Sequence, residues 1–263
     1  MSPPLLAIQL HSLQSVAGLS AQLDLAVRAG FTAVEIIEPH IENGKAMRAN
    51  LDVRGLSAPS AHVSLGMLRN RPGEVVAGAR TAGARQLVVT APPFATNEAD
   101  CQAWRALGRE LGGLAARLID TGLTLCFHNH DNELRKLSDG SVPLDLILNE
   151  GFHGGLKWQA DIAWLVRGGG EPAYWLDRHS DALVSAHVKD IAADPHSDND
   201  IRCECGWADI GHGTIDWECI WAQCRKSGAS LMVAERSDPS DPARFARQSF
   251  EAMERLATES RLA

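Results

Sequence analysis

Short apolar segments recur along the chain, and most are followed by a polar turn and an amphipathic stretch. They lie at 5–11, 31–37, 60–65, 85–91, 123–130, 156–161, 183–189 and 230–236. Amphipathic stretches such as 19–30 and 104–122 end on glycine, which is a common helix stop. Strands that alternate with helices form parallel β–α–β units. About eight such units in 263 residues predict an α/β fold, the closed (β/α)₈ barrel.

The chain is expected to form a single domain over residues 1–263, because no proline- or serine-rich linker interrupts it. A doubly wound open sheet is the alternative, but no GxGxxG turn follows the first segment to support it. A long polar loop at 191–214 follows the seventh segment. Loops of this length are usually lids or disordered, so residues 191–209 are expected to overhang the site and to order when a ligand binds.

Composition and charge limit the classes of function. Hydrophobic residues make up 45% of the chain and charged residues 22%, which allows a large core. A net charge of −8, without a basic run, argues against a nucleic-acid partner. The opening MSPPLLAIQL has no positively charged leader, and its apolar run is too short for a signal peptide or a membrane span. Six scattered cysteines without a CxxC pair indicate reduced thiols in a cytoplasmic protein.

The segments alternate between apolar and polar side chains, and this alternation predicts where the polar groups point. In segment 123–130, Leu125 and Phe127 share one face, while His128 and His130 share the other. Because helices follow the strands, the apolar face belongs under the helices and the polar face looks into the barrel. The last residues of the strands then lie at the end where barrel enzymes keep their chemistry.

Histidines, acids and a lysine gather at these strand ends and are expected to converge. The predicted cluster contains His62, His128, His130, Glu133, Asp161, His187, Lys189 and Glu235. Imidazoles and carboxylates on neighbouring strand ends form the ligand set of a catalytic divalent ion with open positions. Burial of so many ionisable groups without a cation would be costly for each of them.

Some polar residues also have purely structural interpretations. His62 is either a satisfied core histidine or a substrate contact, and Glu35 is either a buried partner of Lys189 or a site residue. Lys189 either pairs with Asp190 or stabilises a developing oxyanion. The histidines in predicted helices or loops are interpreted as surface residues, namely His40, His153, His179 and His196.

Several motifs follow one another in a characteristic order. They read HNHDNEL at 128–134, DIAWLVRGGGEP at 161–172, AHVKDI at 186–191 and GHGTIDW at 211–217, with IQLHSL at 8–13 and GFTAVEI at 30–36. Over nearly the whole chain they resemble the sugar phosphate isomerase/epimerase family of xylose-isomerase-like TIM barrels. The resemblance implies metal ligands at the ends of strands five to eight, which here are His128, Asp161, His187 and Glu235.

One position departs from the family pattern. Many members that epimerise free sugars have a glutamate on strand five, paired across the substrate with the strand-eight glutamate. This chain has His128 there, so the resemblance implies metal binding but not a relay between two carboxylates. His130, further along the same face, is then free to act as a base. Glu133 either orients His130 or caps the following turn.

The resemblance implies a divalent-metal-dependent isomerase or epimerase of a sugar or sugar phosphate. It would remove a proton next to a carbonyl and pass through an enediolate. The alternatives are a keto-sugar or keto-inositol dehydratase or lyase, an apurinic-endonuclease-like phosphodiesterase and a non-catalytic sugar-binding module. The metal would be Mn²⁺, Mg²⁺, Co²⁺ or Zn²⁺, and a homo-oligomer is among the options. The expected roles are catalysis by His130, Glu133 and Lys189 and substrate contact by His62, Trp164 and Glu35.

Overall fold

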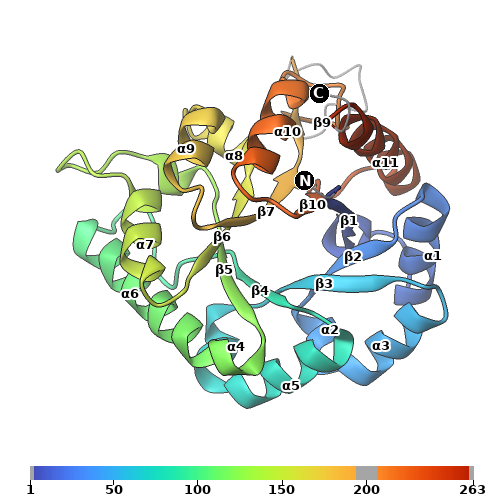
Figure 1. Ribbon diagram of the computed structural model, residues 1–263, viewed down its shortest axis with the longest axis horizontal. Coiled ribbons are helices and arrows are strands. Elements are labelled where there is room, and N and C mark those ends of the chain that lie inside the picture. The colour runs from blue at the N-terminus through green and yellow to red at the C-terminus, as the bar shows by residue number, and fades with distance from the viewer. Residues whose placement is uncertain (1–2, 194–205, 261–263) are drawn as a thin grey trace.

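Eight parallel strands close into a barrel in the computed structural model, which describes residues 3–193 and 206–260 (Figure 1). The strands are β1 Leu5–Gln9, β2 Ala33–Ile37, β3 Ser57–His62, β4 Gln86–Val89, β5 Thr124–His128, β6 Lys157–Asp161, β7 Leu183–Val188 and β10 Leu231–Ala234. They follow one another round the barrel in chain order, and β10 pairs with β1 to close it. Each strand overlaps one of the apolar segments, so the predicted single-domain (β/α)₈ barrel is confirmed.

Helices surround the barrel and join consecutive strands (Figure 1). The longer ones are α1 Leu19–Ala29, α3 Gly44–Asp52, α5 Pro72–Ala82, α6 Cys101–Leu118, α7 Pro143–Phe152, α10 Trp217–Lys226 and α11 Pro242–Glu259. The shorter ones are α2 Glu38–Glu42, α4 Leu65–Asn70, α8 Ile162–Arg167 and α9 Pro172–Arg178, with 3₁₀ turns at Leu10–Leu13, Ile119–Thr121 and Asn132–Leu134. As predicted, α1 ends at a glycine in the left-handed region, Gly30, with φ of 111°. Among the described residues, no helix has the length and apolar character needed to cross a membrane.

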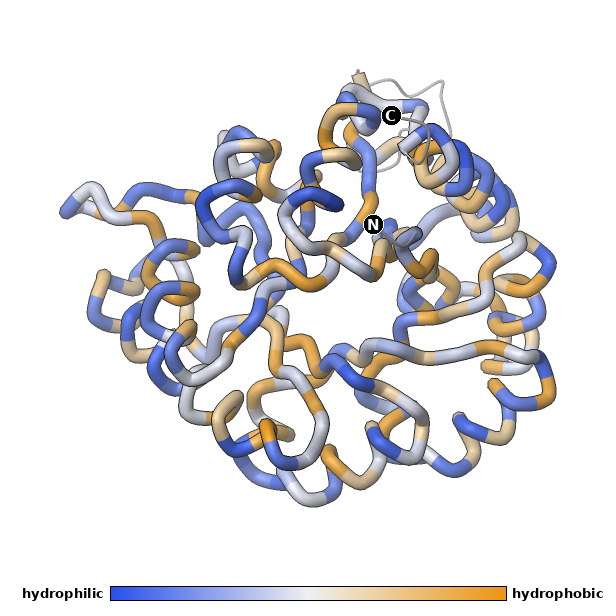
Figure 2. The backbone as a smooth tube through the Cα atoms, in the orientation of Figure 1, coloured by the Kyte–Doolittle hydropathy of each residue, from blue (hydrophilic) through white to orange (hydrophobic). Residues whose placement is uncertain are grey.

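The alternation of the strands separates two environments. Outward residues such as Leu125, Phe127 and Trp158 are buried beneath the helices in the main core, and hydrophilic residues lie on the outer turns of the helices (Figure 2). Inside the barrel, a small apolar cluster includes Ala7 and Ala33, two residues before polar groups on the same strand face. Part of the lower interior is therefore apolar, although Ser185 bonds to Gln86 there, and polar groups lie towards the carboxyl ends of the strands.

Two short strands near the two ends of the predicted 191–214 loop pair with each other as a hairpin. Strand β8, Asp190–Ile191, pairs antiparallel with β9, Trp207–Ala208. The predicted lid depends largely on residues 194–205, which lie outside the described residues together with Cys203 and Cys205.

Asp190 fixes the backbone that follows this hairpin. Its carboxylate accepts the backbone N–H groups of Ile191, Gly211, Gly213 and Ile215 over 2.9–3.2 Å. A side chain at Gly213 would collide with the Asp190 carboxylate, so the close approach requires glycine. The GHGTID amides are therefore already bonded within the protein, and the considered pair of Lys189 with Asp190 is not observed.

His179 is buried rather than on the surface, which corrects the prediction. Its side chain is 7% exposed, and its Nε2 lies 2.8 Å from Asp145 Oδ1. Arg178 donates two hydrogen bonds to the same carboxylate. The sequence position near a helix end gave no sign of Asp145, which comes from α7, so the error arose from a tertiary contact.

Two glycines of α6 should respond to alanine in opposite directions. A Cβ at Gly108 would lie 2.7 Å from the Ile147 carbonyl oxygen of α7, whereas a Cβ at Gly113 meets no atom within 4 Å. We expect Gly108→Ala to lower the free energy of unfolding by about 1–3 kcal/mol through overpacking. Gly113→Ala should raise it by about 0.5–1 kcal/mol through helix propensity. Urea unfolding of both variants measures the difference, and equal effects would contradict the close helix contact.

Candidate metal centre and active site

Most of the predicted site residues meet in one cavity at the carboxyl ends of the barrel strands. Its volume is about 280 Å³, and its lining residues are Gln9, His11, Ile37, His62, Thr90, His128, His130, Trp164, His187, Lys189, Glu235 and Ser237. Asp161 and Glu35 are fully buried beside it. Glu133 is also buried, but it does not line the cavity. The parity of the strands therefore predicted the convergence correctly.

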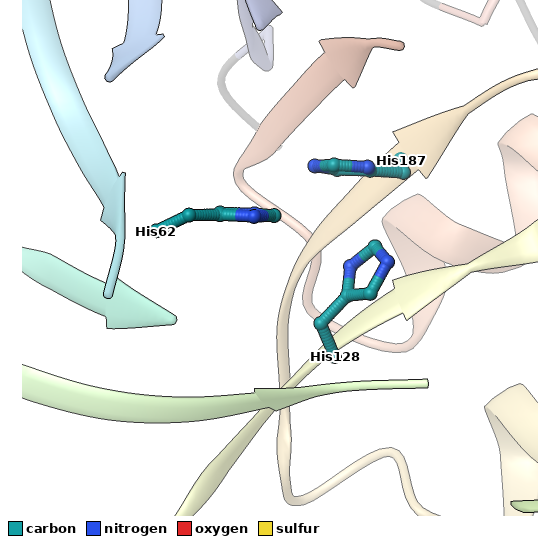
Figure 3. A group of neighbouring side chains, drawn as sticks. All are labelled: His62, His128 and His187. Carbon is teal, nitrogen blue, oxygen red and sulfur yellow. The ribbon is translucent and has the colours of Figure 1, made fainter. Parts of the chain in front are cut away.

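Two overlapping groups of potential metal ligands share His187. His62, His128 and His187 form one group, seen in Figure 3 to converge from three separate strands, and each offers a donor atom within 4.8 Å of the others. Asp161, His187 and Glu235 form the second group by the same measure. The contacts of each ring decide which nitrogen can bind an ion.

The His187 ring is oriented by Glu35. Nε2 lies 2.7 Å from Glu35 Oε1, so this nitrogen carries the proton and donates a hydrogen bond to the carboxylate. Nδ1 then carries the lone pair, and it lies 3.8 Å from Asp161 Oδ2. Both of these atoms are buried without a hydrogen-bond partner among the described residues. A carboxylate behind an imidazole is the usual arrangement that prepares a histidine for metal binding.

His128 presents a nitrogen to the same place. Its Nδ1 lies 3.0 Å from Gln159 Oε1, to which it donates, and its Nε2 lies 3.7 Å from Asp161 Oδ2. Burial and the neighbouring His187 lower the pKa of His128 well below its usual range, which keeps its imidazole neutral. Asp161 uses Oδ1 to cap α8, where it accepts the Trp164 N–H at 3.0 Å, and this leaves Oδ2 free to face the two rings.

Glu235 completes the set from the end of β10. Its Oε2 accepts a hydrogen bond from Lys189 Nζ at 2.6 Å. Burial by itself would raise the pKa of Glu235, but the charge of Lys189 and its hydrogen bond lower that pKa. Burial raises the pKa of Asp161 to about 6. Asp161, His187 and Glu235 therefore form a group that fits a divalent cation, with unpartnered buried atoms on Asp161 and His187 and with His128 Nε2 near Asp161 Oδ2.

Glu35 is the hub of the hydrogen-bond network below the histidines and is 0% exposed. Its two oxygens lie 2.6–2.9 Å from polar atoms of Gln9, Ser60, His62, Gln159 and His187. Burial by itself would raise the pKa of Glu35, but His62 and His187 outweigh it and hold that pKa well below its usual range. Lys189 contacts Glu235 instead, so the considered Glu35–Lys189 pair is not observed. This position favours orienting the imidazoles over touching a substrate.

Replacing Glu35 by glutamine should weaken metal binding. The groups around the carboxylate can all donate hydrogen bonds, so the new amide nitrogen would face a donor unless a neighbour turns. We expect metal affinity to fall about 10- to 100-fold, because His187 loses its charged orienting partner. The unfolding free energy should fall by about 1–3 kcal/mol. Competitive chelator titration and urea unfolding measure the two effects.

Ser60→Ala provides the matched control for this change. Ser60 Oγ donates to Glu35 Oε2 at 2.6 Å, and its removal keeps the carboxylate charge and the His187 contact. Stability should fall modestly, by about 1 kcal/mol, while metal affinity stays nearly unchanged. An equal loss of affinity in both variants would show that Glu35 acts through packing alone.

His130 and Glu133 lie one step further from the strand end. The His130 ring centroid is 5.2 Å from that of His128 and 5.4 Å from that of Trp164. Burial and the charge of Lys189 lower the pKa of His130 to about 4. Glu133 accepts the backbone N–H of His130 at 2.6 Å, and burial raises the pKa of Glu133 to about 7. Glu133 thus holds the backbone of His130 rather than its imidazole.

Three residues near the site were not predicted from the sequence. Thr90 and Ser237 line the cavity from loops after β4 and β10. Trp207 belongs to the hairpin, and Lys189 Nζ lies 4.1 Å from its ring centroid, a cation–π contact. Trp207 also meets Trp164 edge to face at 4.8 Å. Trp207 lies within the polar loop expected to overhang the site, but no local pattern showed that it faces Lys189.

Comparisons with known proteins also indicate a barrel of this kind. The family model described as xylose isomerase-like TIM barrel matches residues 23–256. The rhizopine catabolism protein MocC of Rhizobium meliloti is 28% identical over 166 residues, which cover 59% of this chain and 50% of MocC. The chain therefore spans about half the length of this curated relative.

Solved structures share the fold over nearly the whole chain. A sugar phosphate isomerase/epimerase from Parabacteroides distasonis ATCC 8503 superposes with a TM-score of 0.78 at 16% identity, covering 95% of this chain and 93% of that one. The probable 3-DHS dehydratase AsbF from Bacillus anthracis gives 0.75 at 12% identity, with 94% and 98% covered. The IOLI protein with a bound zinc atom gives 0.70 at 13% identity, with 97% of both chains covered. At these identities the likeness concerns the fold alone.

Proposed function

Because this chain belongs to the xylose isomerase-like TIM-barrel family, we propose that it is a divalent-metal-dependent isomerase or epimerase of a sugar or sugar phosphate. One observation carries the proposal. Asp161 Oδ2 and His187 Nδ1 are buried, lack hydrogen-bond partners among the described residues and lie 3.8 Å apart. Buried polar atoms are rarely left unpaired, and a cation would satisfy both.

The metal would be held by His128 Nε2, Asp161 Oδ2, His187 Nδ1 and the Glu235 carboxylate. This nitrogen and oxygen set accommodates Mn²⁺, Mg²⁺, Co²⁺ or Zn²⁺, and the zinc bound by the IOLI protein supports a divalent ion. When bound, the cation supplies Lewis acidity to the carbonyl oxygen of a substrate.

The neighbouring residues would move the proton. His130 would accept the proton from the carbon next to the carbonyl, since none of the described residues hydrogen-bonds its ring nitrogens and the ring lines the cavity. The electron pair of the broken C–H bond passes into the enediolate, and Lys189 faces its developing negative charge. Return of the proton by His130 to the adjacent carbon would give an isomerase, whereas an epimerase would need a second group to deliver a proton from the opposite face.

Three further residues would shape the site around the sugar. Trp164 stands beside His130 and offers a flat face to C–H groups, as expected for a sugar site. His62 stacks on His187, with ring centroids 5.4 Å apart and planes 8° from parallel, and it lines the cavity where it can contact a hydroxyl. Glu35 would act through His62 and His187 as a positioning residue.

A dehydratase or lyase acting on a keto-sugar or keto-inositol is the second candidate. The observation that favours it is His128, which replaces the glutamate of a two-carboxylate relay with a neutral ring. The same first proton removal would then expel a hydroxyl or glycosidic oxygen on the next carbon. The structural likeness to a probable dehydratase is compatible with this outcome.

Elemental analysis of the purified protein, followed by a screen of keto-sugars in deuterated water, tests the proposal. Metal-dependent deuterium at the carbon next to the carbonyl, without elimination, supports the isomerase or epimerase. Loss of water or of an aglycone supports the lyase. Tight sugar binding without exchange identifies a binding module, and metal-dependent cleavage of abasic DNA identifies a phosphodiesterase. Absence of bound metal and of exchange would refute the proposed chemistry.

A further inference from the structure

A second cavity of about 500 Å³ adjoins the catalytic one. His11, Ile37, His62 and Thr90 line both cavities, so a single ligand can extend from one into the other. The metal-ligand candidates come from β5, β6, β7 and the end of β10, whereas the second cavity lies over the carboxyl ends of β2, β3 and β4. A substituent on the β2–β4 side of a sugar held at the metal would therefore enter this second cavity.

The walls of the second cavity are largely apolar. Its distinctive lining residues are Pro39, Val63, Leu65, Ala91, Pro92 and Pro93. The three prolines present no backbone N–H, which removes donors that would bind hydroxyl or phosphate groups. An aromatic ring fits in an apolar space of about 150 Å³, so the cavity can hold one or two rings.

The charged groups at the rim already have partners. Arg69 donates two hydrogen bonds to Glu110, at 2.6 and 2.7 Å. Glu38 accepts the backbone N–H of Ser64 at 2.7 Å. Among the described residues that line this cavity alone, these two carry the formal charges, which are of opposite sign. The mostly apolar lining therefore favours an apolar occupant.

We propose that the second cavity binds an apolar, ring-sized aglycone, and that the substrates are glycosides whose sugar ring occupies the catalytic cavity. The placement of the sugar rests on the proposed function, while the apolar preference rests on the cavity itself. His62 stands at the junction of the two cavities, where the bond between sugar and aglycone would lie.

The test compares methyl and phenyl β-D-glucopyranoside, which carry no carbonyl and bind without turnover. Calorimetric titration of the full-length protein should give an affinity about tenfold higher for the phenyl glycoside, because its ring leaves water. Gly66 lines the second cavity, and a Cβ there meets only Ser64 Oγ, at 3.8 Å. Gly66→Phe should therefore fill the cavity and bring the two affinities to within about twofold of each other.

Two further variants test whether the preference for the phenyl glycoside depends on the second cavity. Ala91→Phe fills the same cavity from the β4 side and should also abolish the preference. Gly73→Phe adds the same ring on α5, where a Cβ meets no atom within 4 Å, and should keep it. Equal affinities in the unmodified protein, no binding of either glycoside, or a preference that survives in both filled variants would overturn the proposal. Failure of the proposed function would appear separately, as absence of metal-dependent deuterium exchange with keto-sugars.

Discussion

Asp161→Asn should reduce metal-dependent proton exchange by at least about 10³-fold, because it removes a charged ligand from the centre of the site. Oδ2 lies between the His128 and His187 rings, at 3.7 and 3.8 Å, and the amide that replaces it is neutral. The asparagine keeps an oxygen that can accept the Trp164 N–H at the start of α8. The fold should therefore persist while bound metal falls well below one ion per chain.

Asp100→Asn is the matched control for this change. Asp100 caps α6 by accepting the Ala103 N–H at 2.9 Å, in the way that Asp161 caps α8, but it does not line the cavity. Its variant should keep both metal content and exchange. Elemental analysis and deuterium exchange on the Asp161→Asn and Asp100→Asn proteins test whether Asp161 is a metal ligand. Full metal occupancy in Asp161→Asn would remove Asp161 from the ligand set.

His130→Gln should lower the exchange rate by about 10²- to 10⁴-fold, which is the usual contribution of a positioned acid or base. Bound metal should be unchanged, since His130 belongs to neither group of potential ligands. A His128 variant should instead lose metal, so the pair separates the base from the ligand on β5. Deuterium exchange and metal content are measured on the His130 and His128 variants. Slow exchange with retained metal in His130→Gln would support His130 as the base. Loss of metal from His130→Gln would reverse the two assignments.

Glu133→Gln tests how Glu133 supports His130. The glutamine oxygen can still accept the His130 backbone N–H, now 2.6 Å from the carboxylate. Exchange should stay nearly unchanged if Glu133 only holds the backbone. A loss as large as that of His130→Gln would mean that the carboxylate itself takes part in proton transfer.

The local sequence was sufficient to predict the barrel and the side of each strand that faces its interior. Alternation in segments such as 183–189 and 156–161 placed His187 and Asp161 on inward faces, because the side-chain period of a strand is two. Parallel closure then brought these strand ends together, as predicted. The family motifs added which of the inward residues are proposed as metal ligands.

The hydrogen-bond and ion-pair partner of each residue could not be predicted from the sequence. Lys189 bonds to Glu235, 46 positions away, rather than to Asp190 beside it, and Asp190 binds backbone amides instead. His179 was expected at the surface but packs against Asp145. Such choices depend on distances between elements, which neither spacing nor composition encodes.

By itself, the sequence determined the strands, their inward faces and the kind of chemistry their ends can support, because these follow from short-range periodicity and side-chain type. Only the tertiary structure decided that Glu35 fixes the His187 tautomer, that Trp207 reaches Lys189 and that an apolar cavity adjoins the proposed metal site. The physical reason is that hydrogen-bond direction and cavity shape arise from barrel register and loop packing, which bring together residues far apart along the chain.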